Sequence, residues 1–106
     1  RKKEKYDVAI NDYFLAITLN SDLAFVYNNL ASTYRKSGNN EKALSYYTLA
    51  ISKDVKYALA YNNRGSLQID LGNSIEALSD IEKAISLNAR YAPAYNNRGA
   101  LHHQNK

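Results

Sequence analysis

The 106-residue chain contains neither cysteine nor methionine. It therefore has no disulfide framework, no thiolate ligand for a metal and no thiol for redox chemistry. No apolar run approaches the roughly 20 residues that span a bilayer, and no apolar signal-peptide segment follows the charged N-terminus. These absences predict a soluble, cytoplasmic protein with no cofactor and no metal.

Positive charge is in excess only at the N-terminus. The net charge is +4. The first five residues contribute +3 of this, because they contain the basic residues Arg1, Lys2, Lys3 and Lys5 and a single acidic residue, Glu4. The rest of the chain is close to neutral, which argues against a broad nucleic-acid surface. Such a short basic run is either the solvated start of a helix or a contact for an acidic partner.

One tripeptide recurs at a spacing of 34 residues. Its three copies are Tyr27-Asn28-Asn29, Tyr61-Asn62-Asn63 and Tyr95-Asn96-Asn97. All four glycines keep the same spacing, as the pairs Gly38/Gly72 and Gly65/Gly99. A fixed period of this length is typical of a solenoid, in which each unit buries its apolar face only against a neighbouring unit.

Each unit is predicted to be a helix, a short turn and a second helix. Small and apolar side chains at spacings of three and four form one stripe of each helix: Ala24, Tyr27, Leu30, Ala31 and Tyr34 in the first, and Ala43, Leu44, Tyr47, Ala50 and Ile51 in the second. Gly38-Asn39-Asn40 breaks the helix between them. In the next unit, Asn73 and Glu76 form a plausible capping pair. Pro93 falls in the first turn of the helix that follows.

These positions closely resemble the tetratricopeptide repeat (TPR) family. The residues that carry the resemblance are Tyr27, Leu30, Ala31, Tyr34, Gly38, Ala43, Tyr47 and Ala50, then Tyr61, Gly65, Gly72, Ala77, Ile81 and Ala84, then Tyr95 and Gly99. The resemblance implies an all-α, right-handed α-solenoid of stacked antiparallel helix pairs. It divides a single array over 1–106 into a second helix of a partial repeat (1–23), two full repeats (24–57 and 58–91) and a first helix (92–106).

The resemblance also implies a binding groove lined by the first helices. We expect the tyrosine of each tripeptide to face the core and the asparagines to face the groove, where a carboxamide can both donate to and accept from a peptide backbone. The predicted ligand-binding residues are Phe25, Asn28, Asn29, Ser32, Arg35, Leu59, Asn62, Asn63, Ser66, Ile69, Asn96 and Asn97. Alternatively, these asparagines cap helices, bridge adjacent helices or keep the groove hydrated.

Two arginines depart from the family pattern. Arg64 and Arg98 stand where the family usually carries leucine. We expect their aliphatic stems to lie along the neighbouring helix while the guanidinium groups stay in water; the alternative is an anion site. The clamp that some TPR domains use for C-terminal carboxylates is poorly matched, because Lys and Arg positions of the clamp hold Asn28, Pro93 and Asn97, and only Asn63 agrees.

Catalysis is not expected from this chain. Adjacent His102 and His103 point in different directions on a helix, the glycines are explained by the repeat, and the serines have no His or Lys partner. Most tyrosines occupy core positions, so stacking on single-stranded RNA is not favoured. We expect a non-catalytic module that binds a peptide or protein, with a structural spacer, or the substrate-selecting array of a larger enzyme, as alternatives.

Self-association is a further expectation. The absence of an initiator Met and the incomplete outer units suggest a segment of a longer protein. Helices predicted in 1–23 and 92–106 are complementary halves of a repeat. The C-terminal helix of one molecule is therefore predicted to pack on the N-terminal helix of the next, head to tail.

Overall fold

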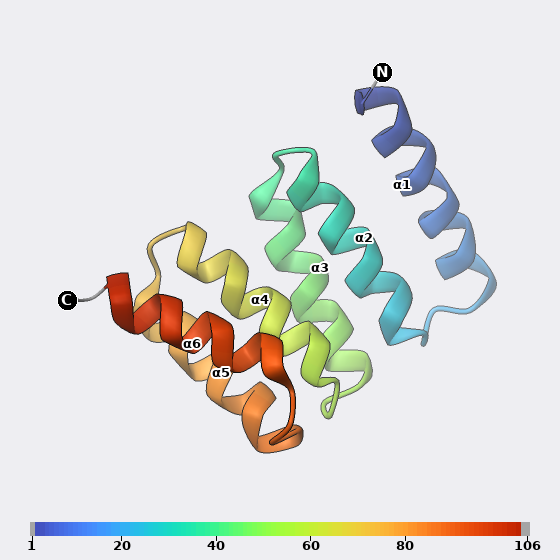
Figure 1. Cartoon of the computed structure of the whole chain (residues 1–106). Helices are drawn as coiled ribbons and strands as arrows, with labels where there is room; N and C mark the ends of the chain where they lie inside the picture. Colours follow the sequence, from blue (N-terminus) through green and yellow to red (C-terminus); the bar gives the residue numbers. More distant parts are fainter. Residues whose placement is uncertain (1, 105–106) are drawn as a thin grey trace. The chain divides into compact units, whose positions relative to one another are not determined.

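A computed structural model describes residues 2–104, which form six helices in two compact units (Figure 1). The first unit, Arg1–Val55, contains α1 (Lys2–Leu19), α2 (Ala24–Lys36) and α3 (Asn40–Lys53). The second, Lys56–Lys106, contains α4 (Ala58–Asp70), α5 (Ser74–Leu87) and α6 (Ala92–Gln104). The predicted all-helical class is confirmed. The division into four repeat segments over 1–106 stays a prediction.

The two predicted glycine turns are present. Gly38 has a φ of 93° and Gly72 a φ of 80°, a conformation that favours glycine because it has no Cβ. The backbone N–H of Asn39 donates to the carbonyl of Tyr34, and that of Asn73 donates to Gln68, both at 2.9 Å. This is the Schellman arrangement, which satisfies the last carbonyls of a helix and reverses the chain.

The two asparagines that begin the second helices act differently. Asn39 caps α3, since its side-chain oxygen accepts from the backbone N–H of Lys42 at 3.1 Å. Asn73 occupies the same place before α5 but makes no side-chain cap, so the predicted capping pair with Glu76 is wrong. Its amide group instead donates to Oε1 of Gln68 at 2.6 Å.

Unit 1 is held together by the antiparallel pair α2 and α3, with α1 packed on α2. The tyrosine Tyr47 is almost fully buried, and its hydroxyl pairs with the hydroxyl of Ser32 at 2.7 Å. Aromatic rings join α1 to this pair, because Phe14 and Tyr46 form a T-shaped contact and Tyr46 stacks on Tyr34. Helix α1 begins at Lys2 and lies within the segment 1–23 that was predicted to hold the second helix of a partial repeat.

Unit 2 repeats the antiparallel pair as α4 and α5, and α6 packs on both. Its core consists of buried small and aliphatic side chains: Ala60, Leu67, Ala77, Ile81, Ala84, Ala94 and Leu101. Helices α4 and α5 approach closely at Gly65, where an added Cβ would lie 2.8 Å from Cγ1 of Ile81. Pro93 is the second residue of α6, as predicted. Among the described residues, no helix is long and apolar enough to cross a membrane.

Candidate functional site

Two of the three recurring tyrosines tie a first helix to the loop before it. The hydroxyl of Tyr27 donates to the carbonyl of Ser21, and the hydroxyl of Tyr95 donates to the carbonyl of Ala89, each at 2.8 Å. Tyr27 is buried and Tyr61 is half-buried, as expected for core positions. Tyr95 is 41% exposed, so the expectation that all three face the core is wrong for the last one.

The six asparagines of the tripeptides do not share one environment. Asn28 and Asn62, the first of their pairs, are 3% and 5% exposed. Asn29 and Asn96 are exposed, while Asn63 and Asn97 are half-buried. Binding by these residues stays a prediction, and the accessible carboxamides are those of Asn29, Asn63, Asn96 and Asn97.

In unit 2 an asparagine pair bridges two consecutive first helices. Nδ2 of Asn97 on α6 donates to Oδ1 of Asn62 on α4 at 2.8 Å, which is the helix-bridging role among the alternatives for these residues. Tyr91, just before α6, also hydrogen-bonds Asn62. Burial raises the pKa of Tyr91 above its ordinary value, and the hydrogen bond with Asn62 partly opposes that shift.

The remaining predicted ligand residues divide into exposed anchors and packed side chains. Phe25 and Leu59 are 53% and 38% exposed, so both offer apolar surface. Ser32 already bonds Tyr47, and Ile69 packs against the core of unit 2. The other two, Arg35 and Ser66, are half-buried.

Of the two arginines that depart from the family pattern, Arg64 is paired with a carboxylate. Arg64 forms a bidentate pair with Asp80, with Nε to Oδ2 at 2.8 Å and Nη2 to Oδ1 at 2.7 Å. The expectation of a hydrated guanidinium is therefore wrong for Arg64. Asp80 is only 7% exposed, and its ion pair with Arg64 was not predicted from the sequence. A sequence signal existed, since an Asp within the apolar stripe of α5 accompanies an Arg in a leucine position of α4.

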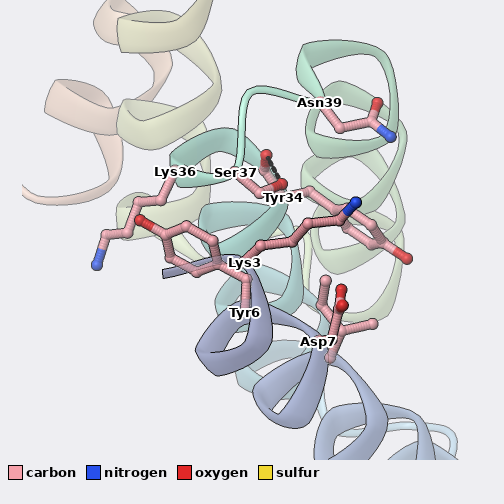
Figure 2. A pocket seen from close by; sticks show the side chains of 8 residues that line it. Lys3, Tyr6, Asp7, Tyr34, Lys36, Ser37 and Asn39 are labelled. Carbon is pink, nitrogen blue, oxygen red and sulfur yellow. Dashed lines mark hydrogen bonds between the residues drawn. The ribbon is translucent and has the colours of Figure 1, made fainter. Parts of the chain in front are cut away.

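Unit 1 contains a cleft of about 670 Å³ that the sequence did not reveal (Figure 2). Helix α1 lines one side of it with Lys3, Tyr6, Asp7 and Ile10, and the end of α2 with the turn that follows lines the other side with Tyr34, Lys36, Ser37 and Asn39. The lining combines two positively charged lysines with two tyrosine rings, so it can hold an anionic group attached to an apolar body. Lys3, part of the basic N-terminal run, thus lines a cleft.

The described residues contain no cluster of three or more His, Cys, Asp or Glu side chains that could hold a metal ion. His102 and His103 are both exposed on α6. The polar contacts described above involve amides, hydroxyls and the Arg64–Asp80 ion pair, and exposed amides and hydroxyls can form hydrogen bonds to a peptide chain.

Solved structures with the same arrangement are TPR domains. The first TPR of Spaghetti (RPAP3), bound to the HSP90 peptide SRMEEVD, is 27% identical with a TM-score of 0.88, covering 97% of this chain and 82% of that one. The TPR domain of Arabidopsis OM64 is 28% identical with a TM-score of 0.88, covering 97% and 85%. The Sgt2 TPR domain from Aspergillus fumigatus, at 24% identity, TM-score 0.87 and coverage of 96% and 69%, supports the fold alone.

No curated protein matches the chain. A family model described as Tetratricopeptide repeat matches residues 26–52 and 58–91, which is more than half of the sequence. These ranges cover most of α2 and α3 and all of α4 and α5, together with both glycine turns. The chain therefore belongs to the tetratricopeptide repeat family.

Proposed function

We propose that this chain is a non-catalytic, cytoplasmic module that binds an extended peptide or protein segment through its first helices. The observation that carries the proposal is that the first helices α4 and α6 contact one another within unit 2, so that their asparagines lie on neighbouring helices. Asn63, Asn96 and Asn97 all lie on these two helices and retain exposed surface. Amides spaced along such a surface can pair with peptide groups whatever the ligand's side chains.

Hydrogen bonds alone are too weak for this task. Each contributes about 1 kcal/mol net, so about six bonds would give ~6 kcal/mol against an association cost of ~4–15 kcal/mol. Apolar anchors must supply the rest. Phe25 on α2 and Leu59 on α4 are exposed hydrophobic side chains at predicted groove positions, and we assign them this role.

Similarity to other TPR domains supports the peptide-binding class. The RPAP3 domain was solved with an HSP90 peptide in place. Its ligand is not transferred to this chain, because the positions that resemble the carboxylate clamp hold Asn28, Pro93 and Asn97 in place of basic residues. We therefore expect the chain to bind an internal extended segment of its partner and not a C-terminal carboxylate.

The proposal is tested with a random dodecapeptide library displayed on phage, followed by calorimetry with synthetic copies of the enriched peptides. The variant Asn29→Ala/Asn63→Ala/Asn97→Ala should weaken binding of those peptides by about tenfold or more, because several amide contacts are lost together. Asn11→Ala, at an exposed asparagine on α1, is the matched control and should bind normally.

Two results would overturn the proposal. Failure to enrich any peptide favours a structural spacer, and unchanged affinity in the triple variant removes the asparagines from the site. Circular dichroism separates loss of binding from loss of fold. The third alternative, a substrate-selecting array within a larger enzyme, would be decided by the sequence of the parent protein on either side.

A further inference from the structure

We propose that Asn97 presents its carbonyl oxygen to the bound peptide, so that the binding surface of unit 2 selects a ligand residue with a free backbone N–H at this position. This inference rests on the proposed function and makes it more specific. It names the ligand group that meets Asn97, and it predicts that proline is rejected there.

The orientation of the Asn97 carboxamide is set by Asn62. Nδ2 of Asn97 on α6 donates to Oδ1 of Asn62 on α4 at 2.8 Å. Asn62 is only 5% exposed, so its carbonyl oxygen depends on protein donors. A buried carbonyl oxygen without a donor is costly, and the amide group of Asn97 supplies that donor. Rotating the Asn97 carboxamide by half a turn would instead place two carbonyl oxygens against each other.

Tyr91, just before α6, fixes the orientation of Asn62 in turn. Burial raises the pKa of Tyr91, and the hydrogen bond with the Asn62 side chain lowers it. A hydrogen bond lowers the pKa of a phenol when the phenol oxygen accepts it, because it then stabilises the phenolate. Nδ2 of Asn62 is therefore the donor to Tyr91, which leaves Oδ1 of Asn62 to accept from Asn97. Both carboxamides are held in one orientation.

The carbonyl oxygen of Asn97 remains available to a ligand. Among the described residues, the contact with Asn62 is the one hydrogen bond that Asn97 makes, and it uses the amide nitrogen. No buried side-chain nitrogen or oxygen in the described part of the chain lacks a hydrogen-bond partner. Asn97 is half-buried, and its Oδ1 has no partner within that part, so this atom must reach solvent.

An amide oxygen held in this way selects for hydrogen-bond donors. A peptide N–H can donate to Oδ1 of Asn97, whereas a ligand carbonyl or carboxylate oxygen would be repelled by it. The second hydrogen on Nδ2 can still bind a ligand carbonyl beside the N–H, but no carbonyl can take the place of the N–H at Oδ1. Every residue except proline supplies a backbone N–H. A freely rotating asparagine would lack this selectivity, because rotation exchanges its donor and its acceptor.

The test is a double-mutant cycle between the peptide and Asn97. The probes are dodecapeptides enriched from the phage library and analogues in which one peptide bond at a time is an ester, which removes a single N–H. We expect one ester analogue to bind the wild-type chain about three- to tenfold more weakly than its parent peptide, because one hydrogen bond is lost. Asn97→Ala should bind that analogue and its parent with nearly equal affinity. Proline at the same position should weaken wild-type binding at least as much as the ester does.

A second variant tests the fixed orientation of the amides. Tyr91→Phe removes the acceptor of Asn62, so the carboxamides of Asn62 and Asn97 can rotate together. We expect the difference in affinity between the parent peptide and the ester analogue to fall below about twofold. Tyr46→Phe on α3 and Asn11→Ala on α1 are the matched controls in unit 1, and both should keep the wild-type difference. Circular dichroism confirms that each variant is folded.

The outcomes separate this inference from the proposed function. Peptides that bind, with no ester position coupled to Asn97, would overturn the inference and leave peptide binding intact. Binding that does not change in Asn97→Ala would have the same consequence. A folded Tyr91→Phe variant that keeps the full ester effect would contradict the fixed orientation of the amides. If no peptide binds, the inference and the proposed function are both wrong.

Discussion

Arg64 and Asp80 form a two-point ion pair between α4 and α5, with contacts of 2.8 and 2.7 Å. The carboxylate is nearly buried, whereas the arginine side chain keeps 21% of its surface exposed. In unit 1 the equivalent positions are Leu30 and Tyr46, so the same helix pair is built once with apolar and aromatic side chains and once with charges.

Removing one partner of this pair should destabilise unit 2. Asp80→Ala leaves a guanidinium at the helix interface, and we expect a loss of about 2–3 kcal/mol, below the ~3–5 kcal/mol of a fully buried pair because Arg64 reaches solvent. The double variant Arg64→Leu/Asp80→Tyr, which copies unit 1, should recover most of that loss. Urea unfolding followed by circular dichroism measures both, and a double variant no better than Asp80→Ala would contradict the transferability of the unit 1 solution.

Two glycines at equivalent positions should respond to alanine with opposite signs. Gly65→Ala forces Ile81 and the α5 backbone to shift, so we expect destabilisation of about 1–3 kcal/mol. Gly99→Ala meets open space on a helix and should stabilise by up to about 1 kcal/mol, because alanine loses less backbone entropy. The comparison is made by chemical unfolding at a concentration where the chain is monomeric. Equal effects at both sites would show that α5 does not approach α4 closely.

Tyr91 should make stability sensitive to alkaline pH. Its folded pKa is raised by burial, so the folded state holds the phenol proton to higher pH than the unfolded chain, whose tyrosine ionises near about 10. The contribution is complete below the unfolded pKa and is lost as pH rises through the folded pKa. Tyr91→Phe should flatten the fall in unfolding free energy above about pH 10, and Asn62→Ala should raise the Tyr91 pKa further. Tyrosine ring carbon NMR follows the titration directly.

The hydroxyl groups of Tyr27 and Tyr95 should contribute differently to stability. Tyr27→Phe removes a hydrogen bond from a buried side chain and leaves the Ser21 carbonyl without that donor, for an expected loss of about 1 kcal/mol. At the exposed Tyr95, water can replace the lost hydroxyl, so Tyr95→Phe should change stability by less than about 0.5 kcal/mol. Hydrogen exchange at the amides just before α2 and α6 reports each change locally. A larger effect at Tyr95 would contradict this order.

The helical architecture could be predicted because its signals are local and repeated. Apolar spacing indicated the helices, and Gly38 and Gly72 marked turns that require a positive φ. The role of Asn73 could not be predicted in this way. Its side chain can either cap α5 or form a hydrogen bond with Gln68. The second contact forms because Gln68 occupies the position that Tyr34 has in unit 1.

The candidate site was less accessible to sequence reasoning. Repetition suggested that equivalent asparagines share one role, yet Asn62 is buried and bonded to Asn97 while Asn96 is exposed. The difference arises from what packs on each helix, which a periodic pattern does not contain. The cleft beside Lys3 is likewise formed by two helices whose contact no single motif describes.

The ion pair between Arg64 and Asp80 also bears on how a repetitive chain reaches one structure. Helices α2 and α4 occupy equivalent places in the two repeats and share the Tyr-Asn-Asn tripeptide, so each could fold against α3 or α5. If α2 paired with α5, Asp80 would be buried against Leu30. If α4 paired with α3, Arg64 would lie beside Tyr46. Each pairing would leave one charge without an opposite charge. The ion pair therefore disfavours swapped pairings between the two repeats, because each swap would leave one charge without its partner.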